Sequence, residues 1–357
     1  MKKLAVILSG YLLIGIICYS RLVQAGAYTP DDNAEILAAG EVIASREKFS
    51  LTQLSRLVEQ GQIPGQSKEL QENVKRQVES HYRQNPTADT AYLYARLLQR
   101  EHEFSGALEI LGPLLAKAPE QVNARILQAG ILMVQGKYHQ AKQSCQALSG
   151  HIEIAVVAIC TLDALSQGLG AGQQTQLKQY YQLLLKLFAK DKTDMGELVL
   201  WVNQILAEMA LRLNQPLAAS KHLSQISLEQ APVSLRVLWA DIALALGRYQ
   251  MLLSRLPGLA GPEKMLPDAL LLRLAIAEKN VGIGDKWQPQ LAQRMNLREI
   301  RQDKEHAGEL ARYYLEVNFA PEKAKYWAEL NYQQTKMASD RDLLVRAFSA
   351  DATGERR

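Results

Sequence analysis

A repeat with a period of 34 residues constrains the fold of this chain more than any other feature of its sequence. Residues 89–107 place a small residue at Ala95, an aromatic at Phe104 and a second small residue at Ala107. Residues 123–141 hold Ala, Tyr and Ala at the same three positions. A period of this length is typical of stacked helix pairs, in which each pair buries its apolar faces against the next. We therefore expect a stack of small helical units.

The spacing resembles the tetratricopeptide repeat, a unit of two antiparallel helices that meet closely at the small residues. The resemblance is specific over residues 86–149, weaker over 196–257 and faint elsewhere. It implies an all-α fold, an α-α superhelical solenoid of tetratricopeptide-like helix pairs that is irregular at both ends. The layout is also similar to that of exported bacterial tetratricopeptide proteins to which no activity is assigned.

The composition agrees with a helical fold. Apolar residues make up 48% of the chain and aromatic residues only 6%, while Ala, Leu and Gln are abundant. Such a composition suits close packing of helix on helix. No stretch alternates apolar and polar residues over the length of a convincing strand.

The N-terminal segment has the features of an export signal. Lys2 and Lys3 precede an apolar run over residues 4–19, and the small residues Val23 and Ala25 suit a signal peptidase. We expect cleavage after Ala25 and a mature protein in the periplasm or outside the cell. The alternative is an uncleaved anchor in the inner membrane, because the apolar run is only a little shorter than the roughly 20 residues of a full span.

Much of the positive charge belongs to this N-terminal segment. Its removal takes away Lys2, Lys3 and Arg21, so the formal net charge of +4 becomes +1. A mature chain this close to neutrality, without a long run of Lys or Arg, has no electrostatic attraction to a phosphate backbone. We therefore expect no nucleic-acid partner.

The rest of the chain divides by how closely it follows the repeat. Asn85 and Pro86 end the segment before the array, and residues 168–172 form a glycine-rich loop inside it. We interpret this loop as a connection, since a phosphate loop follows a strand and this one follows a predicted helix. The predicted segments are a signal peptide (1–25), an N-terminal helical entry segment (26–85), the repeat array (86–257), C-terminal helical repeats and cap (258–348) and a disordered tail (349–357).

Two cysteines, Cys145 and Cys160, remain after removal of the signal. Both are expected in the layer between neighbouring helices, on either side of a turn at residues 149–151. Their offset along the helix axes is about one turn, or about 6 Å. A disulfide tolerates Cα separations up to about 7 Å, so the tilt of the helices decides whether the bond can form. An oxidising compartment favours the disulfide, and the alternative is a pair of buried free thiols.

No motif in the chain points to catalysis, a metal or a cofactor. Its six histidines include no two that are three or four residues apart, the spacing that a helical metal site requires. A nucleophile elbow, a phosphate loop, a haem-attachment motif and a zinc-protease motif are missing as well. Carboxylates such as Glu153, Asp163, Glu305 and Glu309 are expected to form ordinary surface pairs with nearby Lys and Arg. We therefore expect no enzyme activity, no metal and no cofactor.

The inner face of the solenoid is the candidate binding surface. In the tetratricopeptide resemblance, the first helix of each unit lines a concave groove that holds a protein or peptide segment. The matching positions here are Tyr92, Arg96, Gln99, Arg100, Asn123, Ile126, Met133, Val134, Gln204, Glu208 and Arg212. A mixture of Tyr, Arg, Gln and aliphatic side chains suits a peptide with apolar anchors. The apolar face formed by Ile126, Met133 and Val134 should be covered either by a partner or by residues 26–85.

These features together favour a non-enzymatic adaptor or scaffold in the bacterial envelope, whose partner is another protein or a peptide segment. Two alternatives stay open. One is a membrane-anchored structural subunit that keeps residues 1–25. The other is an enzyme acting on envelope polymers, which would need a cluster of acidic residues in a cleft.

Overall fold

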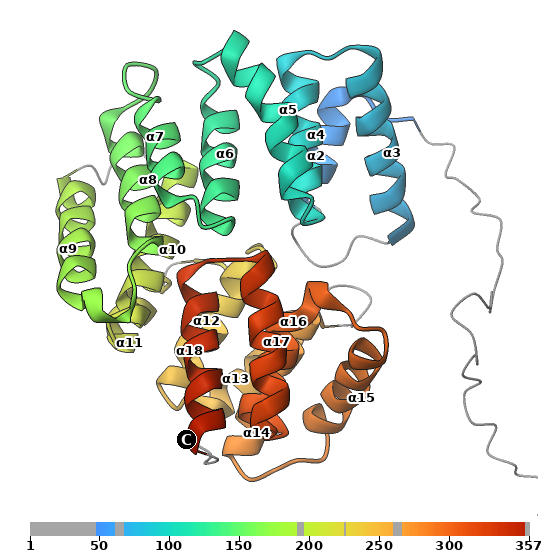
Figure 1. Ribbon diagram of the computed structural model, residues 1–357, viewed down its shortest axis with the longest axis vertical. Helices are drawn as coiled ribbons and strands as arrows, with labels where there is room; N and C mark the ends of the chain where they lie inside the picture. Colours follow the sequence, from blue (N-terminus) through green and yellow to red (C-terminus); the bar gives the residue numbers. More distant parts are fainter. Residues whose placement is uncertain (1–47, 61–67, 191–195, 225, 260–265, 354–357) are drawn as a thin grey trace, which may run out of the picture. The chain divides into compact units, whose positions relative to one another are not determined.

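The computed structural model describes residues 48–60, 68–190, 196–224, 226–259 and 266–353, all within one compact unit (Figure 1). These residues form helices joined by turns, with no β-strand among them. The predicted all-α class is confirmed. The predicted signal peptide and the first part of the entry segment lie outside the described residues.

Seventeen α-helices follow one another along the described part of the chain. They are α2 (Leu51–Gln60), α3 (Lys68–Gln84), α4 (Ala88–Arg100), α5 (Phe104–Lys117), α6 (Val122–Val134), α7 (Tyr138–Gln146), α8 (Ile154–Gln167), α9 (Gln174–Lys190), α10 (Gly196–Arg212), α11 (Pro216–His222), α12 (Val233–Ala245), α13 (Tyr249–Arg255), α14 (Asp268–Asn280), α15 (Trp287–Ile300), α16 (Ala307–Arg312), α17 (Pro321–Gln334) and α18 (Ala338–Thr353). Short 3-10 turns lie at Ala171–Gln173, Leu256–Leu259 and Lys304–His306, and a π-helical turn, η4, at Tyr313–Val317.

Neighbouring helices in this series pack side by side in consecutive pairs, such as α4 with α5, α6 with α7, and α10 with α11. The small residues that define the repeat are buried within these pairs. Ala95 and Ala107 lie in one apolar cluster, and Ala129 and Ala141 in the next, all four fully buried. Because interiors are close-packed, a larger side chain at these positions would push the two helices apart.

In five of the pairs, the first helix ends at a residue with a left-handed backbone conformation. These five residues are His102, Gly136, Asn214, Gly247 and Gly282, with φ between 56° and 75°. In each turn the following N–H donates to the carbonyl five residues earlier, the arrangement that satisfies the last carbonyls of a helix. Each of these residues also lies seven positions after a fully buried alanine. The turn at Gly282 shows that the repeat continues further along the chain than its sequence pattern indicates.

The C-terminal helices share one apolar core. Trp327 on α17 is 1% exposed and packs in a cluster with side chains of α14 and α16. α18 contributes Leu343 and Ala347 to this cluster. The helix continues to Thr353, beyond the end at Phe348 that we predicted from the sequence.

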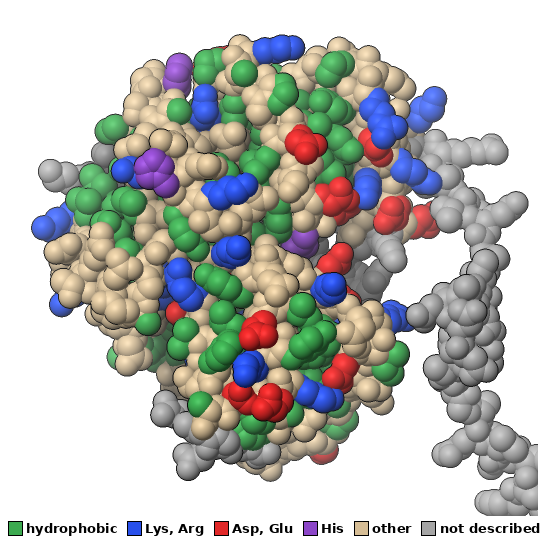
Figure 2. Space-filling view, in the orientation of Figure 1, with side chains coloured by type: hydrophobic (Ala, Val, Ile, Leu, Met, Phe, Trp, Pro, Cys, Tyr) green, Lys and Arg blue, Asp and Glu red, His purple; other side chains and the backbone are tan. Residues whose placement is uncertain are grey.

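The outer surface of α17 and α18 carries mixed charge. Lys325 on α17 pairs with Asp351 on α18 at 2.9 Å. Acidic and basic side chains lie next to one another over this part of the molecule in the face shown in Figure 2. Among the helices that the structure describes, none combines the length and the hydropathy needed to cross a membrane.

The chain comes back to the repeat array at the connection between α17 and α18. The N–H of Lys336 donates to the carbonyl of Val134, at the end of α6, at 2.7 Å. The N–H of Ala338, the first residue of α18, donates to the side-chain oxygen of Gln167 on α8 at 3.1 Å. This second contact joins residues 171 positions apart in the sequence. α18 therefore lies against α8 at one end as well as against α17.

Candidate binding cavity

A cavity of about 730 Å³ lies between the inward faces of α10, α12, α14 and α16 and the connection from α17 to α18. Seven carboxylate side chains and four arginines line it, together with apolar residues such as Leu238 and Leu272. The cavity exists because the first helices of successive pairs turn the same face inward, and α18 closes the space that they leave.

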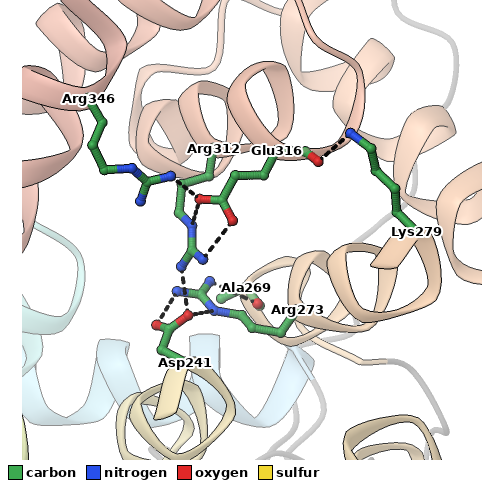
Figure 3. Close-up of polar contacts among 7 residues, drawn as sticks. All are labelled: Asp241, Ala269, Arg273, Lys279, Arg312, Glu316 and Arg346. Atoms are coloured by element: carbon green, nitrogen blue, oxygen red, sulfur yellow. Dashed lines mark hydrogen bonds and ion pairs between the residues drawn. The ribbon is translucent and has the colours of Figure 1, made fainter. Parts of the chain in front are cut away.

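Five charged residues of the cavity wall, each on a different structural element, form a chain of ion pairs (Figure 3). Arg273 on α14 donates through two nitrogens to Asp241 on α12, at 3.1 and 2.8 Å. Arg312 on α16 donates to the same carboxylate at 2.8 Å and to Glu316 on η4 at 3.0 Å. Arg346 on α18 adds a further ion pair to Glu316. The alternation of charge ties these elements together, and we call this set of five residues the charge ladder.

The charge ladder perturbs the acidity of its two carboxyl groups. Burial alone would raise the pKa of Asp241, but the guanidiniums of Arg273 and Arg312 outweigh it and hold that pKa well below its usual range. Burial likewise opposes ionisation of Glu316, and its two arginines lower the pKa of that carboxyl to about 2. Both carboxyls are therefore ionised at neutral pH and compensated by the arginines.

Other carboxylates of the cavity have no such compensation. Glu208, Glu309 and Asp342 form no ion pair with any residue in the described ranges. Burial raises the pKa of Glu208, although Gln204 donates to it at 2.9 Å. Arg212 is close enough to act on Glu208, but its nitrogens donate to backbone carbonyls of residues 166 and 169. The cavity thus has an excess of negative charge outside the charge ladder.

Asp163 is buried, which contradicts the predicted surface pairing of this residue. It is 8% exposed, and its carboxyl group accepts a long hydrogen bond from the side-chain nitrogen of Gln167 at 3.4 Å. Burial, with the nearby charge of Glu208 as a second cause, raises the pKa of Asp163 to about 7. The prediction was wrong because α8 is covered by α10 and by the start of α18, and the sequence around Asp163 does not show that second cover.

The structure distributes the predicted groove residues over several environments. Glu208 and Arg212 line the cavity. Met133 is buried against Met337, and the carbonyl of Val134 accepts the hydrogen bond from Lys336. The remaining predicted residues do not line the cavity, and of these Asn123 is exposed, whereas Tyr92, Arg96, Gln99, Arg100, Ile126 and Gln204 are half-buried.

The cover of the apolar face of α6 differs from the prediction. We expected a partner or residues 26–85 to cover Ile126, Met133 and Val134. The connection between α17 and α18 lies against Met133 and Val134 instead, and Ile126 is half-buried. The reason is that α17 and α18 pack on α16 and thereby carry this connection to the end of α6, a long-range contact that leaves no periodic signal in the sequence.

Cys145 on α7 and Cys160 on α8 form a disulfide with a Cα–Cα distance of 5.5 Å. Both residues are buried. Of the two states that the sequence left open, the structure has the bonded one. The bond joins two helices that belong to successive pairs.

One group of side chains has the composition of a metal site. The ligand atoms of Asp303, Glu305 and His306 lie within 4.8 Å of one another at the start of α16. Asp303 already accepts hydrogen bonds from Arg298 and from the ring of His306. The N–H of Glu305 also donates to Asp303, so the group forms a polar turn before α16.

Sequence reasoning missed the charge ladder. A signal was present, because Asp241 and Arg273 are the single charges in the otherwise apolar runs at residues 237–245 and 269–277. An isolated charge inside an apolar helix needs a partner, and these two residues satisfy each other across successive repeats.

Comparisons with known proteins do not assign the chain to a family. No family model matches it, and no curated protein matches it.

Proposed function

We propose that this protein is a non-enzymatic adaptor of tetratricopeptide type in the bacterial envelope, which binds an extended segment of another protein in its cavity. The observation that carries the proposal is the cavity of about 730 Å³ on the inward faces of successive helix pairs. Its size falls within the roughly 300–1,000 Å³ typical of ligand sites. The recurrent left-handed turn between paired helices supports the tetratricopeptide resemblance.

The charge of the cavity indicates what kind of segment binds. Glu208, Glu309 and Asp342 lie in the wall without an ion-pair partner among the described residues. A segment with Lys or Arg side chains would compensate these charges, while the apolar residues of the wall would contact its aliphatic parts. We therefore expect the partner segment to be basic.

The disulfide supports the proposed location. Disulfides persist in oxidising compartments and are rare in the cytosol, so Cys145–Cys160 agrees with export across the inner membrane. The sequence of residues 1–25 predicts the same route.

The test is capture of the partner from intact envelopes with mild crosslinking. The wild type should capture a protein that the double variant Glu309→Gln/Asp342→Asn does not. The matched control, Glu109→Gln/Glu120→Gln, changes charge equally on exposed residues outside the cavity and should capture as the wild type does. Capture should weaken as salt rises, because charged contacts near the surface are screened. Equal capture by both double variants, or no specific capture by the wild type, would sink the proposal.

A membrane-anchored structural subunit is the first alternative. It requires that residues 1–25 stay on the mature protein. Mass spectrometry of the protein from envelopes separates the two: a mature N-terminus at Gly26 supports the exported adaptor, and retention of Met1–Ala25 supports the anchored subunit.

An enzyme acting on envelope polymers is a second candidate that one observation favours. Burial raises the pKa of Glu208 and of Asp340, both in the cavity wall, as a general acid requires. Both carboxyls accept hydrogen bonds from protein groups, Glu208 from Gln204 and Asp340 from Asn331. Release of new reducing ends from envelope polysaccharide by the wild type, lost in Glu208→Gln, would favour the enzyme over the adaptor.

A further inference from the structure

The connection between α17 and α18, residues Thr335–Met337, lies against the ends of α6 and α7 as a short extended peptide, and we call it the strap. Thr335 has extended backbone angles, φ −128° and ψ 131°. The N–H of Lys336 donates to the carbonyl of Val134 at 2.7 Å, and the carbonyl of Lys336 accepts from the hydroxyl of Tyr138. Backbone hydrogen bonds of this kind hold an extended peptide whatever side chains it carries.

The side chain of Met337 supplies the apolar anchor of the strap. It packs against a buried cluster that contains Met133, Ala129 and the Cys145–Cys160 disulfide. A thioether side chain is flexible and fits irregular apolar surfaces. The cluster thus offers an apolar contact surface beside two groups that hydrogen-bond a peptide backbone, the carbonyl of Val134 and the hydroxyl of Tyr138. Extended peptides are recognised by this combination of backbone hydrogen bonds and an apolar contact.

Gly136 leaves room for the strap. A Cβ added there would lie 2.9 Å from Cδ of Lys336 and 3.2 Å from its Cβ. The equivalent turn positions of other pairs include His102 and Asn214, which carry side chains in the same left-handed conformation. At Gly136 the turn therefore combines a left-handed conformation, which glycine adopts without strain, with a close approach of the Lys336 side chain.

The residues that follow the strap, at the start of α18, form polar contacts with the end of α8 and the loop after it. The N–H of Ala338 donates to the side-chain oxygen of Gln167 at 3.1 Å. Arg341 donates to the carbonyls of Gln167 and Leu169 at 2.9 and 2.8 Å. Met337 and Ala338 also line the cavity, so the surface under the strap continues directly into it.

We propose that the surface under the strap is a second peptide-binding subsite. In the free protein the strap occupies this subsite. Once the strap has left, an extended segment of the partner occupies it, with an apolar side chain in place of Met337. This inference rests on the proposed adaptor function, because the subsite extends the same cavity. The strap then makes binding conditional, since the partner competes with a segment of the adaptor itself.

A labelled synthetic peptide with the sequence of residues 333–341 is the probe, and its binding is measured by fluorescence polarisation. Lys336→Pro removes the N–H that bonds to Val134, and the extended backbone of Thr335 accepts a following proline. Lys336→Ala is the matched control, because it removes the side chain and keeps the N–H. The peptide should bind Lys336→Pro at least tenfold more tightly than it binds the wild type or Lys336→Ala. Equal binding by all three proteins, or no binding to any of them, would overturn the proposal.

A second measurement keeps the proposal testable if Lys336→Pro does not fold. Excess unlabelled peptide is added to the wild type, and hydrogen exchange is followed at the backbone amides. Exchange should become faster at Lys336 and Ala338, whose N–H groups lose Val134 and Gln167, while the amides within α6 and α8 stay protected. Unchanged protection of Lys336 and Ala338 at every peptide concentration would contradict displacement of the strap.

Partner capture separates a failure of this inference from a failure of the proposed function. If Lys336→Pro and Lys336→Ala capture the partner equally, and the peptide does not bind, the adaptor function stands and the subsite is refuted. If the peptide binds Lys336→Pro but the wild type and Glu309→Gln/Asp342→Asn do not differ in partner capture, the subsite stands and the adaptor proposal fails.

Discussion

Asp163 and Glu208 place two carboxyl groups close together inside the protein. Asp163 lies on α8 and Glu208 on α10, and both interact with the side chain of Gln167. Ionisation of both would put two like charges in a region without a compensating ion pair among the described residues. Their environment therefore favours the protonated form of at least one of them.

Because the pKa of Asp163 is raised, the difference in stability between the wild type and Asp163→Asn should depend on pH. Because the folded-state pKa of about 7 exceeds the usual 3.8, the folded state binds the proton more tightly, and stability falls as pH rises from about 4 through about 7. Asp163→Asn cannot ionise, so the variant should lie within about 1 kcal/mol of the wild type near pH 4.5 and exceed it at pH 8, by up to about 4 kcal/mol. Urea unfolding followed by circular dichroism at the two pH values measures this difference.

An exposed carboxylate on another helix is the control for this experiment. Asp89→Asn, on α4, should change the free energy of unfolding by less than about 0.5 kcal/mol at both pH values. A difference between wild type and Asp163→Asn that stays constant from pH 4.5 to 8 would show that Asp163 keeps an ordinary acidity.

The predictable residues were those whose environment is set by the repeat. The spacing of the small residues indicated that Ala95 and Ala129 meet a paired helix, and both are fully buried. The environments of Asp163 and Met133 were not predictable, since the start of α18 and the strap cover them from far along the chain. A periodic pattern reports contacts between neighbouring units and is silent about contacts over longer distances in the sequence.

At the scale of elements, the charge ladder joins α12, α14, α16 and α18 through direct ion pairs. The repeat alone would bring together only units that follow one another in the sequence. Asp241 is its central acceptor, because two arginines from different helices meet on its carboxylate. Removing one member of such a pair leaves the other charge without compensation.

Asp241→Asn should therefore destabilise the protein strongly. We expect a loss of about 2–4 kcal/mol at pH 7, below the full effect for a buried pair since the side chain is 22% exposed. Because the folded-state pKa of Asp241 lies below its unfolded value, this contribution is present above about pH 4 and is lost as pH falls further. Denaturant unfolding of wild type and variant at pH 7 and pH 3 measures both effects.

Glu79→Gln supplies the matched control for the charge ladder. Glu79 pairs with Arg83 within α3, where the arginine is 74% exposed, so its loss should change stability by less than about 1 kcal/mol. If Asp241→Asn changes stability no more than Glu79→Gln does, the charge ladder does not hold the helices together.

The disulfide is the second link between elements, because it fixes α7 to α8. It closes a loop with a sequence separation of 15 residues, and a loop of about 15 residues corresponds to about 3 kcal/mol of stabilisation in the chain-entropy model. The double variant Cys145→Ala/Cys160→Ala should lose about that much, measured by urea unfolding without reductant. Reductant should lower the stability of the wild type and leave that of the double variant unchanged. An equal response of both proteins to reductant would show that the bond does not form in solution.

The helices and their local turns were largely predictable, and the long-range connection formed by the strap was not. The glycine-rich loop after α8 was readable from local rules. The strap was not readable, since Thr335–Met337 has no turn motif or apolar period, and its conformation depends on Val134 and Gln167.

At the scale of the whole molecule, the contacts of the strap change how the helices are coupled. In a simple repeat array each unit touches only its neighbours, so the ends can unfold separately from the middle. Here the strap and α18 connect α6 and α8 directly with the C-terminal helices. Unfolding should therefore be more cooperative than in an open array of the same length.

Deletion of the strap and α18 tests this coupling. A chain that ends at Gln334 should unfold in two separate urea transitions, one for the helices near α6–α8 and one for the later helices, whereas the full chain should show a single transition. Hydrogen exchange measured along the urea series assigns each transition to its helices. A chain that ends at Thr353 keeps the strap and all of α18, and it should unfold as the full chain does. Two transitions in the full chain would contradict the coupling, because the contacts of Lys336, Ala338 and Arg341 would then be too weak to make the repeat units unfold together.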